Sequence, residues 1–284
     1  MNISVLYPTG FGSTKVEPDY EFESDIAKKL SIPSVLFNYD EFLMGDKLRL
    51  FGNLDEIKGS IVIYRGWMMN PAEYQKLYDI LEKSGIKLIN SPAEYCNCHM
   101  FPYTYARLKD YTPKTLSFKE GDTIDWNRVR TEFDRFIVKD FVKSVKGFGF
   151  PEYLTNDMSD EKLDEHISKF KQLRGDLYTG GIVLKQYMEL DKVNNHTHEF
   201  RAFYMNGQLL TVYHNSGNLE DEIMIDFFKT KEFSNLDSHF YTVDFARLKN
   251  GTYVVIETGD GQVSGLPTET EAEALYNSLK KQNF

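Results

Sequence analysis

Hydrophobic residues in the first third of the chain gather in short runs that alternate with segments of helical spacing. Apolar, β-branched and aromatic residues fill 3–7, 35–37 and 61–64, as is typical of buried strands. Asn70-Pro71-Ala72-Glu73 and Ser91-Pro92-Ala93-Glu94 each combine an N-cap residue, a proline in the first turn and a glutamate three residues after the cap, which predicts two helix starts. This alternation favours a small α/β unit with a mostly parallel sheet.

The pattern changes at Pro113, because a proline ends any helix that precedes it. The middle of the chain predicts strands at 115–118 and 136–139, and helices at 126–133 and 159–174. The last third is rich in predicted strands, at 182–188, 199–205, 208–213, 240–245 and 253–257. Asn206-Gly207 and Asn250-Gly251 are hairpin signals, and Thr268 begins a closing helix with a capping box.

Length and charge narrow the class of protein. A chain of 284 residues is about right for two or three packed subdomains, and 14% aromatic residues indicate well-filled cores. The formal net charge of −10 disfavours general nucleic-acid binding, although it leaves room for a small basic pocket. Because the sequence has neither a long apolar run nor a charged leader, we expect no membrane span, no signal peptide and a cytoplasmic protein.

The cysteines are Cys96 and Cys98. A disulfide between positions two apart is sterically poor, and two thiols do not make a zinc site, so we expect reduced thiols. His99 lies beside them, which leaves a metal-binding interpretation open.

A first candidate phosphate-binding segment follows the strand at 136–139. Lys139 ends this apolar strand, Lys143 follows four residues later, and Lys146-Gly147-Phe148-Gly149 comes next. Glycines let backbone amides approach phosphates closely, and lysines add positive charge. The same residues would also fit a surface loop with solvated lysines. Neither a Walker A motif nor a GxGxxG fingerprint is present.

Two further strands carry charges among apolar residues. Lys185 interrupts the apolar run 183–189, which ends in Glu189, and a buried strand rarely carries a lysine unless it is paired or faces a cleft. Glu199 and Arg201 lie on one face of the next strand, and an arginine fork suits a phosphate. An edge strand with Lys185 in water, and a cross-strand ion pair at Arg201, remain the simpler interpretations.

Two strands near the C-terminus carry carboxylates. Antiparallel pairing across the Asn250-Gly251 turn would bring Asp244 near Glu257, and Asp260 follows shortly after. Two adjacent carboxylates repel each other, and a divalent cation such as Mg²⁺ resolves the repulsion. A pair of exposed acids near a turn is the alternative.

The order of these motifs resembles the ATP-grasp superfamily over residues 113 to 270. The segment 257–262 is similar to a divergent clade of that superfamily named for two arginines and a lysine. The resemblance implies an α+β ATP-grasp fold, in which two α+β subdomains clasp ATP, preceded by a small α/β domain. The implied domains are 1–112 (N-terminal α/β), 113–181 (small ATP-grasp subdomain) and 182–284 (large subdomain with the metal site).

The resemblance also implies roles for single residues. Lys139 and Lys185 would contact the α- and β-phosphates or the adenine edge, and the 142–150 loop, with Gly147, would close over the phosphates. The remaining implied nucleotide contacts are the adenine-reading hinge and its neighbours: Gln186, Tyr187, Met188, Glu189 on the ribose, and Glu199. Asp244 and Glu257 would hold Mg²⁺, and Asp260 would replace the asparagine that many members carry.

The function implied by the resemblance is ATP-dependent ligation. A small-molecule or peptide carboxylate would become an acyl phosphate, which an amine would attack, with Arg201, Lys143 and Arg65 as the catalytic candidates. Arg65, at a strand end, would bind the substrate carboxylate. Glu199-Phe200-Arg201 and the Asp244 strand also resemble the cell-division-cycle branch of assembly factors, so ATP binding with a protein partner and no turnover stays open, as does a phosphotransferase.

Overall fold

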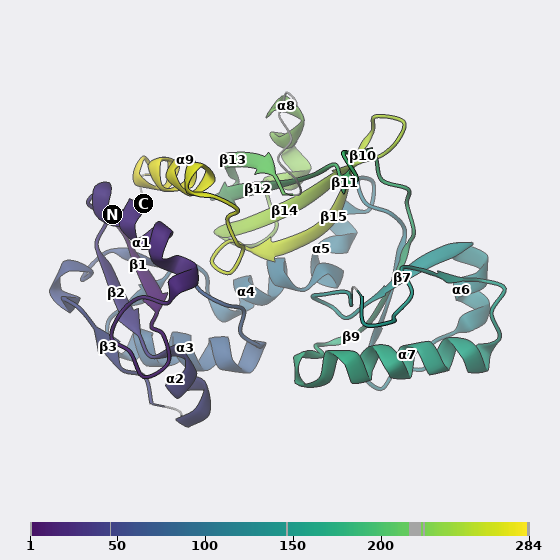
Figure 1. The fold of residues 1–284 in the computed structure, drawn as a ribbon, viewed down its shortest axis with the longest axis horizontal. Coiled ribbons are helices and arrows are strands. Elements are labelled where there is room, and N and C mark those ends of the chain that lie inside the picture. Colours follow the sequence, from purple (N-terminus) through teal and green to yellow (C-terminus); the bar gives the residue numbers. More distant parts are fainter. Residues whose placement is uncertain (1, 46, 146, 216–222, 224, 283–284) are drawn as a thin grey trace.

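The computed structural model describes residues 2–45, 47–145, 147–215, 223 and 225–282. Among them, three larger sheets make up the molecule, one in each lobe and one above and between the lobes (Figure 1). None of the helices in these ranges is long and apolar enough to cross a membrane.

The N-terminal sheet has the order β3-β2-β1-β4-β5 and is parallel except at β3. Its strands are β1 (Ile3–Pro8), β2 (Ser34–Phe37), β3 (Leu50–Phe51), β4 (Ile61–Tyr64) and β5 (Lys87–Leu88). Helices α1 (Glu21–Lys29) and α9 (Glu269–Lys280) cover one face, and α2 (Tyr39–Gly45), α3 (Pro71–Lys83) and α4 (Pro92–His99) cover the other. Because both faces are covered, β1 and β4 are apolar throughout. The predicted mostly parallel sheet is confirmed.

The second sheet is antiparallel with the order β6-β9-β7-β8. Its strands are β6 (Thr115–Lys119), β7 (Arg135–Lys139), β8 (Leu154–Thr155) and β9 (Gly181–Gln186). Helices α6 (Trp126–Glu132) and α7 (Asp160–Arg174) pack on the face that carries Phe136 and Leu184. Since side chains alternate along a strand, Lys139 and Lys185 lie on the opposite face, toward the third sheet.

The third sheet is antiparallel with the order β13-β12-β14-β15. Its strands are β12 (Glu199–Met205), β13 (Gln208–His214), β14 (Phe240–Arg247) and β15 (Tyr253–Asp260), and α5 (Phe101–Leu108) and α8 (Ile225–Phe228) pack on one face. Both hairpin signals are confirmed, and Asn206 and Gly207 have the positive φ angles of 49° and 77° that a tight turn needs. The smaller elements are the ribbon of β10 (Lys192–Val193) and β11 (His196–Thr197) and the 3₁₀ turns Pro18–Tyr20, Leu54–Glu56, Gly175–Leu177 and Lys231–Phe233.

The expected domain boundaries differ from the packing. Strand β9 lies inside the second sheet, so the expected boundary between 181 and 182 cuts through that sheet. Helices α4 and α5, which belong to the expected 1–112 unit, pack on β15, and α9 returns to pack on α1. The expected capping boxes at Asn70 and Ser91 are present. At Thr268 the N-cap is confirmed but the box is not, because its hydroxyl accepts from the Thr270 N–H and donates to Glu271 instead.

Candidate active site

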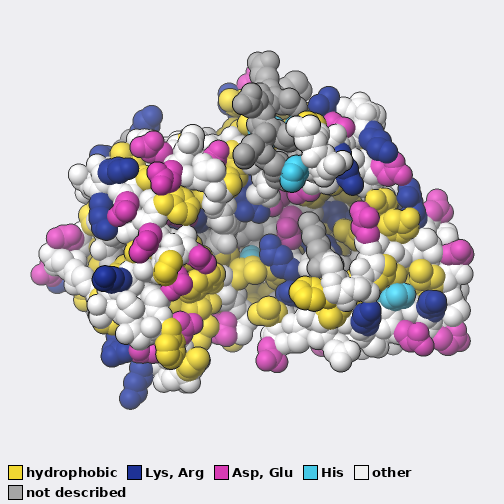
Figure 2. All heavy atoms as spheres, in the orientation of Figure 1, with side chains coloured by type: hydrophobic (Ala, Val, Ile, Leu, Met, Phe, Trp, Pro, Cys, Tyr) yellow, Lys and Arg dark blue, Asp and Glu magenta, His cyan; other side chains and the backbone are white. Residues whose placement is uncertain are grey.

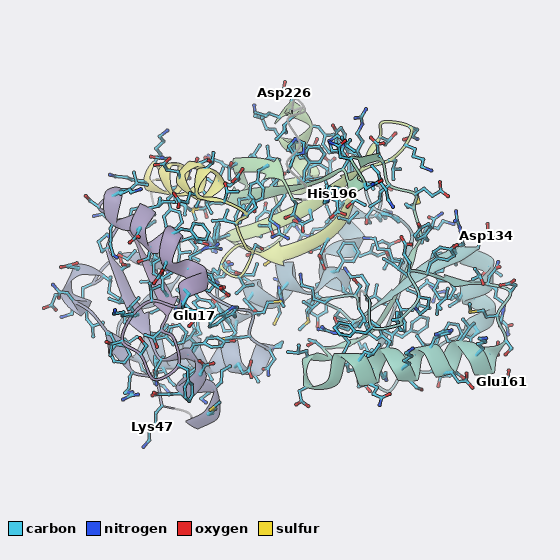
Figure 3. The ribbon with its side chains drawn as sticks, in the orientation of Figure 1. Glu17, Lys47, Asp134, Glu161, His196 and Asp226 are labelled. Carbon is cyan, nitrogen blue, oxygen red and sulfur yellow. The ribbon has the colours of Figure 1, made fainter. Side chains whose placement is uncertain are left out.

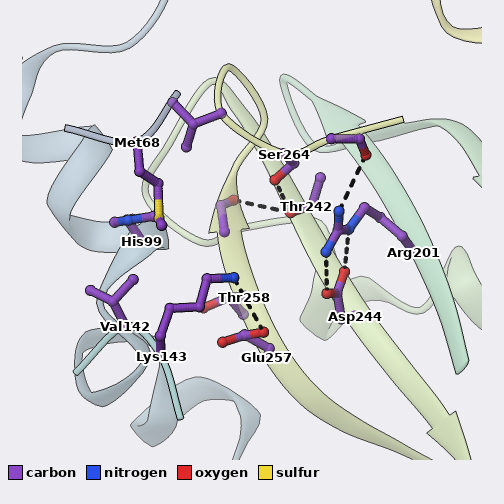
Figure 4. Close-up of a pocket in the computed structure, with 13 residues that line it drawn as sticks. Met68, His99, Val142, Lys143, Arg201, Thr242, Asp244, Glu257, Thr258 and Ser264 are labelled. Atoms are coloured by element: carbon purple, nitrogen blue, oxygen red, sulfur yellow. Dashed lines mark hydrogen bonds and ion pairs between the residues drawn. The ribbon is translucent and has the colours of Figure 1, made fainter. Parts of the chain in front are cut away.

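A cavity of about 110 Å³ lies where the loop after β7, the third sheet and the N-terminal lobe meet (Figure 4). Basic and acidic side chains sit side by side in the hollow between the lobes (Figure 2). The cavity is lined by Met68, His99, Val142, Lys143, Arg201, Thr242, Asp244, Glu257, Thr258, Gly259, Val263, Ser264 and Gly265. Typical ligand pockets hold roughly 300–1,000 Å³, so this one suits a group of phosphate size rather than a whole nucleotide.

Asp244 and Glu257 face each other across β14 and β15. The antiparallel pairing expected from the Asn250-Gly251 turn is therefore confirmed, and both carboxylates line the cavity. The register shifts directly after Asp244, and a bulge of this kind re-aims the side chains beside it.

Arg201 neutralises Asp244. The two residues are cross-strand partners in β12 and β14, and two parallel hydrogen bonds join them, from Nε to Oδ1 at 2.8 Å and from Nη2 to Oδ2 at 2.7 Å. Burial alone would lower the pKa of Arg201, but the Asp244 carboxylate outweighs it and raises that pKa, so the guanidinium stays charged.

Two lysines neutralise Glu257. The Lys139 Nζ lies 2.9 Å from Oε1, and the Lys143 Nζ lies 3.9 Å from Oε2. Burial alone would raise the pKa of Glu257, but the two ammonium groups override it and lower the pKa to about 2. The cavity therefore holds two ionised carboxylates, each already paired with a cation.

Lys185 connects the second sheet to the third. Its Nζ donates to the carbonyls of Ile256 at 2.8 Å and Val255 at 3.4 Å and lies 3.9 Å from the centroid of the Phe101 ring. Burial, and then the charge of Lys139, lower the pKa of Lys185 well below its usual value. Neither Lys139 nor Lys185 is among the residues that line the cavity; both lie beside its Glu257 wall.

The predicted adenine-reading hinge lies away from the cavity lining. The N–H of Gln186 donates to the Lys114 carbonyl at 2.8 Å, and the N–H of Tyr187 donates to the Arg135 carbonyl at 2.9 Å. Within the described ranges, the Met188 N–H has no acceptor.

The other predicted nucleotide contacts are also outside the lining. Glu189 is exposed and pairs with Lys249 at 2.7 Å, which lowers the pKa of its carboxyl. Glu199 is half-buried and accepts from the Thr197 hydroxyl. Gly147 is exposed with a φ of 79°, and Lys146 lies outside the described residues.

Arg65 was predicted to bind a substrate carboxylate, and this prediction is wrong. The side chain is 1% exposed, and its Nε and Nη2 each donate to Glu23 at 2.8 Å. Its Nη1 donates to the carbonyls of Gly261, Gln262 and Ser264 at 2.6, 3.2 and 2.9 Å. These acceptors occupy the guanidinium, so Arg65 holds the 261–265 loop, which forms one cavity wall.

Asp260 was predicted to be a third metal ligand, and this prediction is also wrong. Three residues separate it from Glu257, and the alternation along β15 therefore turns it to the opposite face. It is 0% exposed and accepts from the Asn90 Nδ2 at 2.6 Å, the Gln262 N–H at 2.8 Å and the Cys98 Sγ at 3.7 Å. Burial raises the pKa of Asp260 to about 7 despite these donors.

His99 is a cavity residue that the sequence pattern linked only to the cysteines. It is 7% exposed, and its buried Nδ1 has no hydrogen-bond partner in the described residues. Burial, and then the charge of Lys143, lower the pKa of His99 to about 4, so the ring is neutral near pH 7. Thr242 and Ser264, whose hydroxyls lie 2.8 Å apart, were also missed. Thr242 could have been found, because it lies two residues before Asp244 on the same face; for His99 the sequence holds no such signal.

The carboxylates fit a magnesium ion but not a protein-only metal cage. Among the described residues, no cluster of three or more His, Cys, Asp or Glu side chains could hold a metal. Mg²⁺ is commonly bound by one or two carboxylates together with substrate phosphates, and Asp244 and Glu257 match that donor set. Both cysteines are free, as expected.

Comparisons with known proteins agree with this geometry. A sequence model of the ATP-grasp domain, that of family 3 in the clade named for two arginines and a lysine, matches residues 125–279, which is more than half of the chain. No curated protein matches the sequence.

Solved structures share the fold at low sequence identity. The D-alanine–D-alanine ligase from Coxiella burnetii matches with a TM-score of 0.59 and 13% identity over 99% of this chain and 93% of that one. A RimK domain ATP-grasp protein from Sphaerobacter thermophilus matches with a TM-score of 0.59 and 12% identity, over 98% and 99%. The ATP-grasp ligase PsnB, solved with a precursor variant, Mg and ADP, matches with a TM-score of 0.56 and 13% identity, over 98% and 97%. The chain therefore belongs to the ATP-grasp superfamily, as a member of family 3 of the clade named for two arginines and a lysine.

Proposed function

We propose that this protein binds Mg-ATP and uses it to join a carboxylate to an amine through an acyl phosphate. The observation that supports the proposal best is the arrangement of paired charges at one cavity. Asp244 and Glu257 face each other there, and Arg201, Lys139 and Lys143 are their counter-ions. Carboxylates suit the metal and cations suit the phosphates, so both halves of a Mg-ATP site are present.

Nucleotide binding would exchange these ion pairs. Arg201 and Lys143 would turn to the terminal phosphates, and Lys139, with Lys185 beside it, would meet the inner ones. Asp244 and Glu257 would then hold Mg²⁺, which neutralises phosphate charge when bound. Because the cations already stand around the cavity, their reorientation is short.

The nucleoside would lie along the hinge after β9. The Met188 N–H has no acceptor among the described residues and is the donor that we assign to the adenine ring, whereas those of Gln186 and Tyr187 are occupied. Glu189 would bind the ribose after release from Lys249. Glu199, on the Arg201 face of β12, and the loop around Gly147 are further candidates for contact.

The reaction would proceed in two displacements. A carboxylate oxygen attacks the γ-phosphorus and ADP leaves, which gives the acyl phosphate. The amine nitrogen then attacks the acyl carbon, phosphate leaves and the amine loses a proton. Arg201 stabilises charge on the transferred group, and the apolar residues Met68, Val142 and Val263 limit water near it.

The substrates would be small molecules or peptides. PsnB has been solved with a precursor, Mg and ADP, and D-alanine–D-alanine ligases share the fold. By this analogy we expect a carboxylate donor and an amine acceptor bound between the N-terminal lobe and the third sheet, where His99 and Ser264 offer polar atoms.

Thermal unfolding with ATP, with Mg²⁺ and with both tests the nucleotide site. A ligand at about a hundred times its dissociation constant adds about 2.7 kcal/mol to the unfolding free energy. We expect wild type to gain stability from Mg-ATP and Glu257→Gln to gain far less. Glu120→Gln, which removes an exposed carboxylate paired with Lys171, is the matched control and should respond as wild type does. An unresponsive wild type at saturating Mg-ATP would remove the proposal.

Phosphate release then separates ligase turnover from ATP binding alone. A ligase releases phosphate only when both a carboxylate and an amine are present, and a panel of amino acids and dipeptides is a first source of both. Release that needs only one acceptor would indicate a phosphotransferase. ATP binding without release, together with a protein that binds only the ATP form, would indicate an assembly factor.

A further inference from the structure

We propose that Asp140 and Arg174 are positioning residues that fix the start of the 142–150 loop and thereby aim Lys143 into the phosphate cavity. The inference rests on the proposed nucleotide site and adds a buried ion pair that stands outside it. Neither residue lines the cavity, and both act through the loop.

Asp140 closes a tight turn directly after β7. Its Oδ1 accepts from the N–H groups of Val142 at 2.7 Å and Lys143 at 2.6 Å, and its own N–H donates to the Lys143 carbonyl at 2.9 Å. These three bonds determine the backbone of the two residues that enter the cavity lining.

Arg174 holds the other oxygen of this carboxylate. Its Nε donates to Oδ2 at 2.7 Å, and its Nη2 donates to the Leu177 carbonyl at 2.8 Å. The Asp140 side chain is 0% exposed, so an unpaired charge there would be costly. Because Arg174 supplies the counter-charge, Lys139 and Lys143 on either side of Asp140 keep theirs for Glu257.

The residue between Asp140 and the loop is anchored as well. Phe141 donates its N–H to the Thr179 carbonyl at 3.1 Å and accepts from the Phe101 N–H at 2.9 Å. Its ring lies against Gly180, where an added Cβ would come within 2.4 Å of the ring. The base of the loop is thus fixed from the β9 side and from α5, while Gly147 and Phe148 farther along are exposed.

Helix α7 carries the arginine from the edge of the lobe to this turn. Glu161, near its start, lies at the outer edge of the molecule, and the helix runs from there toward the centre (Figure 3). A second arginine–aspartate pair, Arg130 with Asp160 at 2.6 Å, lies at the outer end of the same helix. It provides a matched control of the same chemistry in the same subdomain.

The decisive variant removes both partners, Asp140→Ala with Arg174→Ala, so that net charge is unchanged. We expect its dissociation constant for Mg-ATP to rise about tenfold, because the Lys143 hydrogen bond to a charged phosphate loses its preset geometry. The affinity for AMP, which lacks the terminal phosphates, should change less than about twofold by the same reasoning. Hydrogen exchange at the Val142 and Lys143 amides should become faster without nucleotide.

The control pair Arg130→Ala with Asp160→Ala should leave both affinities and both amides as in wild type. Arg174→Lys, which keeps the charge, should bind Mg-ATP more tightly than Arg174→Gln. Equal losses for ATP and AMP would reduce the pair to a structural role and overturn the inference, as would faster exchange with unchanged ATP affinity. A wild type that binds no ATP would overturn the proposed function and this inference together, whereas a wild type that binds it equally well with and without the pair overturns the inference alone.

Discussion

Glu257 stands between two lysines and the proposed metal, so its substitution should affect two kinds of binding in opposite directions. In wild type, metal-free ATP must take Lys139 and Lys143 from an ionised, buried carboxylate, which is then left unpaired. Glu257→Gln removes that cost, so metal-free ATP should bind several-fold more tightly to the variant, by about 1 kcal/mol or more. Mg-ATP should bind more weakly to it, because one metal ligand is lost.

Calorimetric titration of ATP in a chelator, and again in excess Mg²⁺, measures both effects. Glu120→Gln should match wild type in both buffers. A Glu257→Gln variant that loses affinity for metal-free ATP would contradict the exchange of ion pairs and leave Glu257 as a structural acid.

Asp260 should make stability depend on pH. Its pKa is raised from 3.8 to about 7 in the folded chain, so between these values the unfolded chain has released the proton that the folded chain keeps. The free energy of unfolding therefore falls as pH rises from about 4 to 7, by up to about 4 kcal/mol, and levels off above. Glu257 has the opposite sign, with a lowered pKa whose stabilisation is lost as pH falls from 4.5 toward 2, below this window.

Unfolding of wild type and Asp260→Asn from pH 5 to pH 8 isolates this dependence. The difference between the two free energies should shift in favour of Asp260→Asn as pH rises. A difference that stays constant over the range would show that Asp260 keeps its ordinary pKa.

Local pattern was enough to predict some of these residues and not others. The Asp244–Glu257 pairing follows from one hairpin turn and a count of alternating positions. Applied to Asp260, the same count would have turned it away from the metal, but it depends on β15 continuing past Glu257. The partner of Arg65 is Glu23, 42 positions earlier, and no sequence spacing reports a contact of that kind.

At the scale of elements, the hairpin between β12 and β13 depends on a glycine in a restricted place. Gly207 has a φ of 77°, and a Cβ there would lie 2.5 Å from the Ser234 carbonyl oxygen. Gly251, in the next hairpin, has a φ of 85° but open space around it. Gly251→Ala should therefore cost only the backbone strain of about 1 kcal/mol, and Gly207→Ala about 2–3 kcal/mol because backbone must also move. Urea unfolding compares the two, and equal costs would mean that the Ser234 contact relaxes freely.

Most elements could be predicted from periodicity, but their assignment to sheets could not. The apolar run of β9 is as compatible with the third sheet as with the second, and the choice is made by the side chains of α6 and α7 that pack on Ile182 and Leu184. The same holds for α9, whose amphipathic pattern does not say that it returns to α1. Sequence reports the period of an element, and tertiary packing decides its neighbour.

At the scale of the whole molecule, Arg65 and Glu23 join the N-terminal lobe to the cavity wall. Glu23 lies on α1, Arg65 follows β4, and the arginine also holds the loop after β15 and thus the wall formed by Val263, Ser264 and Gly265. Tyr276 on α9 donates to the same Glu23 at 2.8 Å. One buried ion pair therefore ties together segments from both ends of the chain.

Removing one partner of this pair should be worse than removing both. Arg65→Met leaves Glu23 buried and uncompensated, which should cost about 3–5 kcal/mol of unfolding free energy, and Glu23→Gln strands the arginine in the same way. The double variant leaves no buried charge, so it should be more stable than either single variant by about 1 kcal/mol or more. Denaturant unfolding of the four proteins completes the cycle. If the two single costs simply add in the double variant, the residues act independently, and the link between the lobe and the cavity wall has to be sought in the carbonyl contacts of Arg65 instead.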